Sequence, residues 1–67
     1  MRANRNVLQL AMARKCMTLR TLVETAQMPE STVKNVLYGR NVSANTLGRV
    51  CKALDVDPAD VIEFKED

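Results

Sequence analysis

The apolar residues of this chain recur at helical spacing through almost its whole length. Leu19, Leu22, Val23 and Ala26 stand at positions i, i+3, i+4 and i+7, and residues 47–54 repeat the same spacing. Residues spaced in this way lie on one face of an α-helix. No stretch alternates between apolar and polar residues for long enough to predict a strand. The pattern therefore predicts an all-α domain.

Capping residues divide this pattern into five predicted helices. Thr18 and Ser43 can each accept a hydrogen bond from the first turn of a following helix. Gly39 is expected to end a helix in a left-handed turn. Asp57-Pro58 combines a capping acid with proline at the first helical position. The expected helices span residues 5–15, 18–26, 30–38, 44–54 and 58–63.

A chain of 67 residues has room for one hydrophobic core, so residues 1–67 are expected to form a single domain. Gly48 stands inside the fourth predicted helix, where glycine costs about 1 kcal/mol relative to alanine. Close packing against a neighbouring helix is the expected reason, and close approach of a ligand is the alternative. The expected core consists of Leu8, Met12, Leu19, Leu22, Val23, Val33, Val36, Leu37, Leu47, Val50, Leu54 and Ile62.

The composition excludes several classes of function. Tyr38 and Phe64 are the only aromatic residues, too few for a surface that stacks the bases of single-stranded nucleic acid. No apolar run approaches the roughly 20 residues that cross a bilayer, and no signal-peptide pattern is present. We therefore expect a cytoplasmic protein without a membrane partner.

Catalysis and metal binding are also disfavoured. The chain contains no histidine and only two cysteines, Cys16 and Cys51, whereas a structural zinc site needs four nitrogen or sulfur ligands. A glycine-rich phosphate loop and a nucleophile–base pair are both missing. We expect reduced, partly buried thiols, no catalytic residues, no metal, no cofactor and no small-molecule ligand.

The charges are distributed unevenly along the chain. Residues 1–52 carry nine Lys or Arg and two Glu, a net charge of +7, whereas residues 53–67 carry one Lys and six acids, a net charge of −5. A basic body favours a polyanionic partner such as nucleic acid. A solvated surface without a partner is the alternative that charge alone leaves open.

Two short predicted helices, 18–26 and 30–38, are separated by only three residues, Gln27-Met28-Pro29. This is the separation found in a helix-turn-helix, whose second helix lies in the major groove of DNA. Short turns and polar outer faces also occur in other helical hairpins. The outward side of the second helix carries residue types that bind base edges or phosphates. These are Glu30, Ser31, Lys34, Asn35 and Tyr38.

Residues 18–40 resemble the helix-turn-helix of the lambda-repressor/Cro-type (XRE) family and align with its pattern without a gap. Ser31-Thr32-Val33, Gly39-Arg40 and residues 46–54 carry most of the resemblance, which covers about residues 6–64. The chain is similar in particular to short single-domain members. The resemblance implies a compact five-helix DNA-binding domain of a transcriptional regulator, with double-stranded DNA as its partner.

The resemblance also implies roles for individual residues. Two of these residues also have an alternative to a contact with DNA. The hydroxyl of Thr32 can form a hydrogen bond within its own helical turn, and the ring of Tyr38 can pack over Gly39. Two positions depart from the family pattern. Leu19 replaces a glutamine that makes a polar contact in the family. Gln27 replaces a glycine of the turn, so Gln27 is expected to adopt a left-handed backbone conformation. The base-contacting positions are Glu30, Ser31, Thr32 and Asn35, and the backbone-contacting positions are Thr18, Lys34, Tyr38, Arg40, Asn41 and Asn45.

A homodimer is expected, because one domain of this size covers a single half-site on DNA. The first helix is the candidate interface, since Val7 and Leu10 extend its apolar stripe beyond what a core requires. The segment around Val61 and Phe64 is the rival interface. The alternative function is a protein-interaction module, such as an antitoxin or anti-repressor, that binds another protein through its helices.

Overall fold

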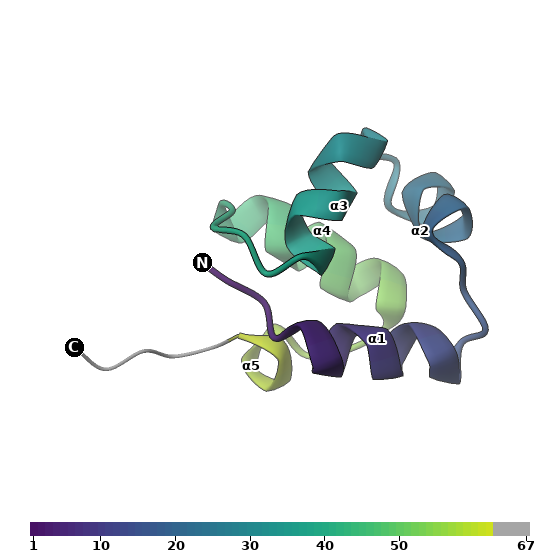
Figure 1. Ribbon diagram of the computed structural model, residues 1–67, viewed down its shortest axis with the longest axis horizontal. Helices are drawn as coiled ribbons and strands as arrows, with labels where there is room; N and C mark the ends of the chain where they lie inside the picture. The colour runs from purple at the N-terminus through teal and green to yellow at the C-terminus, as the bar shows by residue number, and fades with distance from the viewer. Residues whose placement is uncertain (63–67) are drawn as a thin grey trace.

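Five helices with short connections make up the part of the chain that the computed structural model describes, residues 1–62 (Figure 1). Within that range no strand occurs, and the all-α prediction is confirmed. The predicted bounds are accurate to one residue for the first four helices. The last helix ends at Val61, whereas residue 63, its predicted end, lies outside the described residues. The helices are α1 (Arg5–Arg14), α2 (Leu19–Ala26), α3 (Glu30–Leu37), α4 (Ala44–Leu54) and α5 (Pro58–Val61).

The residues expected to cap helices do so. Thr18 and Ser43 each accept a hydrogen bond at 3.2 Å from the backbone N–H three residues later. Asp57 accepts one at 2.9 Å from the N–H two residues later. Asn4, which was not predicted as a cap, does the same for α1 through two backbone N–H groups. These bonds satisfy N–H groups of the first turn that have no partner inside the helix.

The core lies where α2, α3 and α4 meet, with α1 and α5 along one edge of the molecule (Figure 1). Leu22, Val36 and Val50 of these three helices have no exposed surface. Leu8, Val33, Leu47 and Leu54, also expected in the core, are buried. Met12, Leu19, Val23, Leu37 and Ile62 are half-buried and pack against it.

Several core residues were not expected. In α5 the buried residue is Val61, and Ile62 is only half-buried. Three of the unexpected core residues are alanines, which a prediction based on large apolar residues passes over. The additional buried residues are Ala3, Ala11, Ala26, Met28, Cys51 and Val61.

Two expectations about single residues are wrong. Cys16 is exposed rather than partly buried, and it stands between α1 and α2 with a φ of 53°. Gly48 does not pack closely, because a Cβ at this position would meet nothing within 4 Å. The thiol of Cys51, by contrast, is buried. Burial, with a smaller contribution from Asp57, raises the pKa of this thiol above its ordinary value, so the neutral thiol suits the core.

Residues 1–4 connect two distant parts of the fold. Ala3 is buried and forms an isolated antiparallel bridge with Ile62. The N–H of Asn4 donates to the carbonyl of Val61 at 2.7 Å. On the other side, the N–H of Val42 donates to the carbonyl of Met1 at 2.7 Å. This segment therefore lies between α5 and the loop that joins α3 to α4, and it holds that loop in place.

Candidate nucleic-acid interface

The connection between α2 and α3 has the geometry that the sequence predicted. Gln27 ends α2 in the left-handed conformation, with φ 55° and ψ 47°, and its N–H donates to the carbonyl of Val23. Pro29 precedes α3, and its carbonyl accepts hydrogen bonds from the N–H groups of Thr32 and Val33 at 3.1 Å. The left-handed residue turns the chain sharply, so α3 packs against α2 and both contact α4.

The buried side of α3 determines which of its residues face outward. Val33 and Val36 have no exposed surface, so the residues opposite them face solvent. Glu30 and Ser31 are exposed, and Asn35 is half-buried at the edge of this outward side. Three of the four predicted base-contacting residues thus share one surface.

The exposure and hydrogen bonding of Thr32 and Tyr38 can be compared with the roles expected for them. Thr32 is half-buried, and its hydroxyl makes no hydrogen bond to any residue between 1 and 62, so the alternative of bonding within its own turn is not observed. Tyr38 directly follows α3, and 51% of its surface is exposed. That exposure leaves the phenol available to a partner.

Charged and polar side chains on the outward side of α3 and just after this helix form two pairs, called below the pairs on α3. The ammonium of Lys34 lies 3.6 Å from a carboxylate oxygen of Glu30, one helical turn earlier. Nη1 of Arg40 donates a hydrogen bond at 3.1 Å to Oδ1 of Asn35. The guanidinium of Arg40 also lies 5.9 Å from the centre of the Tyr38 ring. In both pairs a residue expected to contact a base is joined to one expected to contact phosphate.

The other predicted backbone-contacting residues are not members of these two pairs. The Thr18 hydroxyl caps α2 and lies 3.1 Å from the hydroxyl of Thr21. Asn41 accepts a hydrogen bond from the amino group of Met1, and Asn45 is exposed in the first turn of α4. Among residues 1–62, no hydrogen bond or ion pair joins Thr18, Asn41 or Asn45 to the pairs on α3.

The sequence profile of the Cro/C1-type HTH DNA-binding domain matches residues 7–67. The chain belongs to this family. No curated protein and no solved structure matches it. Family membership makes the chain a DNA-binding transcriptional regulator in general terms, with DNA as its partner. Domains of this family are generally not enzymes.

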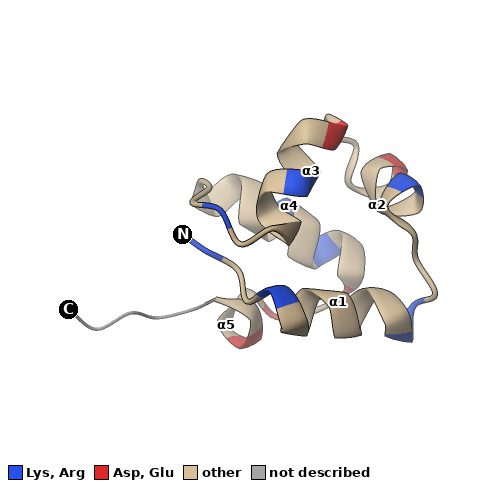
Figure 2. Cartoon of the chain, viewed as in Figure 1, with Lys and Arg blue, Asp and Glu red and all other residues tan. Residues whose placement is uncertain are grey.

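The charge asymmetry of the sequence is preserved in this helix-turn-helix domain. Figure 2 shows Lys and Arg on the N-terminal segment and on α1 to α4, with acidic residues also on α2 and α3, whereas the charged residue of α5, Asp60, is acidic. Asp55 and Asp57 stand in the connection between α4 and α5, and Asp60 is in α5. In the described range, no group of acidic or cysteine side chains could hold a metal ion. None of the helices found there has the length and apolar character needed to cross a membrane.

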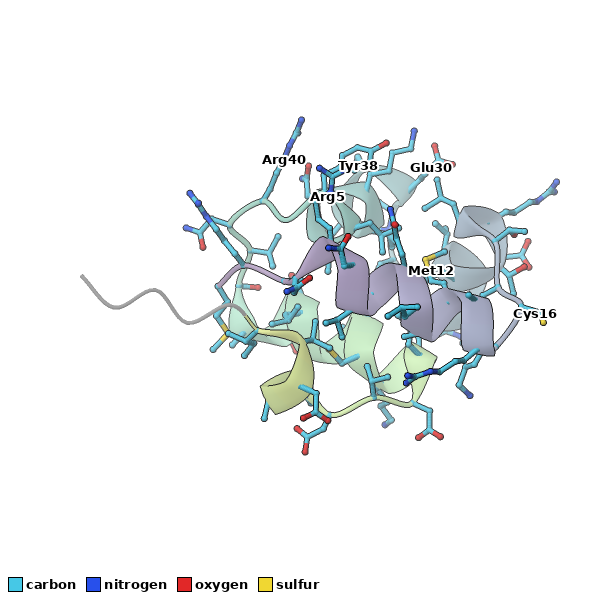
Figure 3. All side chains as sticks on the ribbon, turned by 60° about the horizontal axis from the view of Figure 1, so that its bottom comes forward. Arg5, Met12, Cys16, Glu30, Tyr38 and Arg40 are labelled. Carbon is cyan, nitrogen blue, oxygen red and sulfur yellow. The ribbon has the colours of Figure 1, made fainter. Side chains whose placement is uncertain are left out.

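The sequence did not predict that Arg5 lies on the surface that carries Tyr38 and Arg40. Figure 3 shows Arg5, Tyr38 and Arg40 on one side of the molecule, with Glu30 farther along the same side. Arg5 belongs to α1 and lies far from the helix-turn-helix in sequence. No spacing rule connects it to Tyr38, so only the folded structure shows that the two are neighbours.

Proposed function

We propose that this protein is a sequence-specific, cytoplasmic regulator of transcription that inserts α3 into the major groove of duplex DNA. The observation that carries the proposal is the orientation of α3. Its apolar side, Val33 and Val36, is fully buried, so Glu30, Ser31 and Asn35 face outward next to a helix-turn-helix turn. An α-helix of this kind fits the major groove, where each base pair presents a distinct pattern of donors and acceptors.

The chemistry of the outward side supports separate roles for its residues. The amide of Asn35 can both donate to and accept from adenine, and the carboxylate of Glu30 can accept from cytosine N4. Ser31 and Thr32 can bond to several bases. We assign contacts with the DNA backbone to Thr18, Lys34, Tyr38, Arg40, Asn41 and Asn45.

The two pairs on α3 support a simple exchange on binding. Exposed pairs of this kind contribute only about 0–1 kcal/mol, so they separate readily. If Lys34 and Arg40 move onto phosphates, the carboxylate of Glu30 and an additional lone pair of Asn35 become available to bases. Each phosphate contact then replaces a pair that was already present, and the cost of releasing the reading residues is small.

We further propose that the protein acts as a homodimer through α1. Leu10 is 58% exposed on this helix, whereas Val7, the other expected interface residue, is half-buried against the core. Val61 is buried and unavailable to a partner, and Phe64 lies outside the described residues. Leu10 is therefore the apolar side chain that best supports the interface, and sedimentation of Leu10→Lys should show a shift toward monomer.

Selection of bound duplexes from a random pool tests the proposed function most directly. A two-fold symmetric consensus is expected, since a dimer places two copies of α3 on related half-sites. A pool that shows no enrichment after several rounds would contradict sequence-specific binding. An asymmetric single site would contradict the dimer while leaving major-groove recognition intact.

Salt dependence separates DNA binding from the alternative function, a protein-interaction module such as an antitoxin or anti-repressor. Exposed Leu10 is the observation that favours that alternative. With four or five phosphate contacts per chain of a dimer, log K should fall with log salt at a slope of roughly −7 to −9. A slope near zero, together with a protein complex that survives high salt, would favour the alternative instead.

A further inference from the structure

The aliphatic stem of Arg5 lies beside Gly39, just after α3. A Cβ placed on Gly39 would lie 3.2 Å from Cγ and 3.5 Å from Cδ of Arg5. The stem therefore lies on the turn that follows α3, although Arg5 itself begins α1. A long side chain positioned in this way loses less rotamer freedom when its charged end binds a partner.

The charged end of Arg5 has no protein partner in the part of the chain that the structure describes. Arg5 is exposed, and none of the ion pairs or side-chain hydrogen bonds between residues 1 and 62 includes its guanidinium. It lies on the same side of the molecule as Tyr38 and Arg40 (Figure 3). The guanidinium is therefore available to an external anion on the face that carries α3.

Next to Arg5 the surface is hollowed between α1, the start of α2 and α3. The hollow has a volume of about 290 Å³. Its apolar members, Met12, Leu19 and Leu37, are half-buried and pack against the core. Two cations and two neutral polar residues complete the wall. The lining residues are Arg5, Gln9, Met12, Leu19, Lys34, Leu37 and Tyr38.

We infer that this hollow receives one stretch of the sugar–phosphate backbone of DNA, with Arg5 as a phosphate-binding residue outside the helix-turn-helix. Arg5 and Lys34 provide positive charge for the phosphates, while Met12, Leu19 and Leu37 offer an apolar surface to a deoxyribose ring. The inference rests on the proposed function and extends its surface onto α1.

Charge and continuity favour DNA over a protein as the occupant. No acidic residue lines the hollow, and Glu30, whose carboxylate lies 3.6 Å from the lining residue Lys34, is paired with that cation. Lys34 and Tyr38 belong to both the hollow and the outward side of α3, so a duplex seated on α3 reaches the hollow without a second docking event. DNA in the hollow would also give Leu19 a role, since an apolar side chain can pack against a deoxyribose ring.

The test compares Arg5→Met with Arg49→Met, a matched control on α4 that is exposed and does not line the hollow. Methionine keeps an unbranched stem against Gly39, and circular dichroism checks that both variants are folded. Arg5→Met should weaken binding to selected and scrambled duplexes by the same factor, about tenfold or more, because one charged contact per chain is lost. The salt slope should become shallower by about 1 per chain. Arg49→Met should stay within about twofold of the wild type.

Duplexes carrying single neutral methylphosphonates identify the phosphate itself. The wild type should lose affinity at one phosphate per half-site to which Arg5→Met is insensitive. Equal effects of the two methionine variants, or no phosphate that distinguishes Arg5→Met from the wild type, would overturn the inference while leaving DNA binding established. A wild type that binds no duplex would contradict the proposed function and this inference together.

Discussion

The inward and outward sides of α3 are stabilised by different interactions. On the inward side, Val33 and Val36 are completely buried, and burial of such side chains contributes about 1.5–3 kcal/mol each. On the outward side, Glu30 with Lys34 and Asn35 with Arg40 form solvent-exposed pairs worth about 0–1 kcal/mol each. The helix therefore has one side that must stay in place and one whose partners can change. This division suits a surface that exchanges its own contacts for those of a ligand.

The largest expected difference between the two sides is in stability. Val36→Asp should unfold the domain, because an unpaired buried charge costs several kcal/mol against a total of about 5 kcal/mol. Ser31→Asp, which places the same charge on the outward side, should keep the circular dichroism spectrum and the unfolding midpoint of the wild type within a few degrees. A folded Val36→Asp variant would show that the assignment of the two sides is wrong.

Within the outward side, Asn35 and Lys34 should affect binding in different ways. Asn35→Ala should flatten the preference at one base pair per half-site, since a bidentate Asn–adenine contact discriminates by about 1–3 kcal/mol. Lys34→Ala should weaken all duplexes equally, because phosphate contacts carry no direct sequence information. Affinities of both variants for the consensus and for a scrambled duplex, at one salt concentration, decide this. If Asn35→Ala lowers both affinities by one factor, the reading role passes to Ser31 or Glu30.

The two glycines of the chain differ in the same way, because a side chain would be crowded at one of them and would meet open space at the other. Gly39 follows α3 with a φ of 74°, and a Cβ there would lie 3.3 Å from the carbonyl oxygen of Ala3. Gly39→Ala should therefore destabilise the fold by about 1–2 kcal/mol, the cost of a left-handed conformation for a residue with a side chain. Urea denaturation measures this difference. An unchanged midpoint would mean that the turn relaxes without loss.

The smallest expected effect belongs to Gly48, inside α4. A Cβ there meets open space, so Gly48→Ala should stabilise the domain by up to about 1 kcal/mol. The same variant tests whether a ligand approaches this helix closely. Raised stability with unchanged DNA affinity would assign no binding role to the glycine. Raised stability with weaker DNA binding would favour close approach of the duplex, the alternative left by the sequence.

Whether the sequence predicts a given contact depends on how far apart the two residues stand in the chain. Helices and most of the core follow from apolar spacing over a few residues, and the left-handed Gln27 follows from its place in a family pattern. The pair of Glu30 and Lys34 stands at i and i+4, so helical spacing could have indicated it. Neighbouring residues such as Val61 and Ile62 are harder to separate, because one residue of helical rotation exchanges their burial.

Contacts that depend on the assembled fold could not be predicted in this way. Arg40 reaches Asn35 across the end of α3, and Arg5 reaches Gly39 from another helix altogether. Neither pairing follows a local rule of spacing. The candidate site is therefore predictable in the residues of α3, which one helical face brings together, and unpredictable where another element contributes.

The segment before α1 has a consequence for the order in which the protein is completed during synthesis. Ala3 pairs with Ile62, while Met1 pairs with Val42 in the loop after α3. A growing chain cannot form the first of these contacts until Ile62 has left the ribosome. The segment before α1 is thus anchored to both of its neighbours only at the last step, by contacts of long sequence separation, which form slowly. A nascent chain that has already made α2 and α3 still lacks the contact with Ile62, so the segment that contacts the loop after α3 reaches its final arrangement only when the described fold is complete.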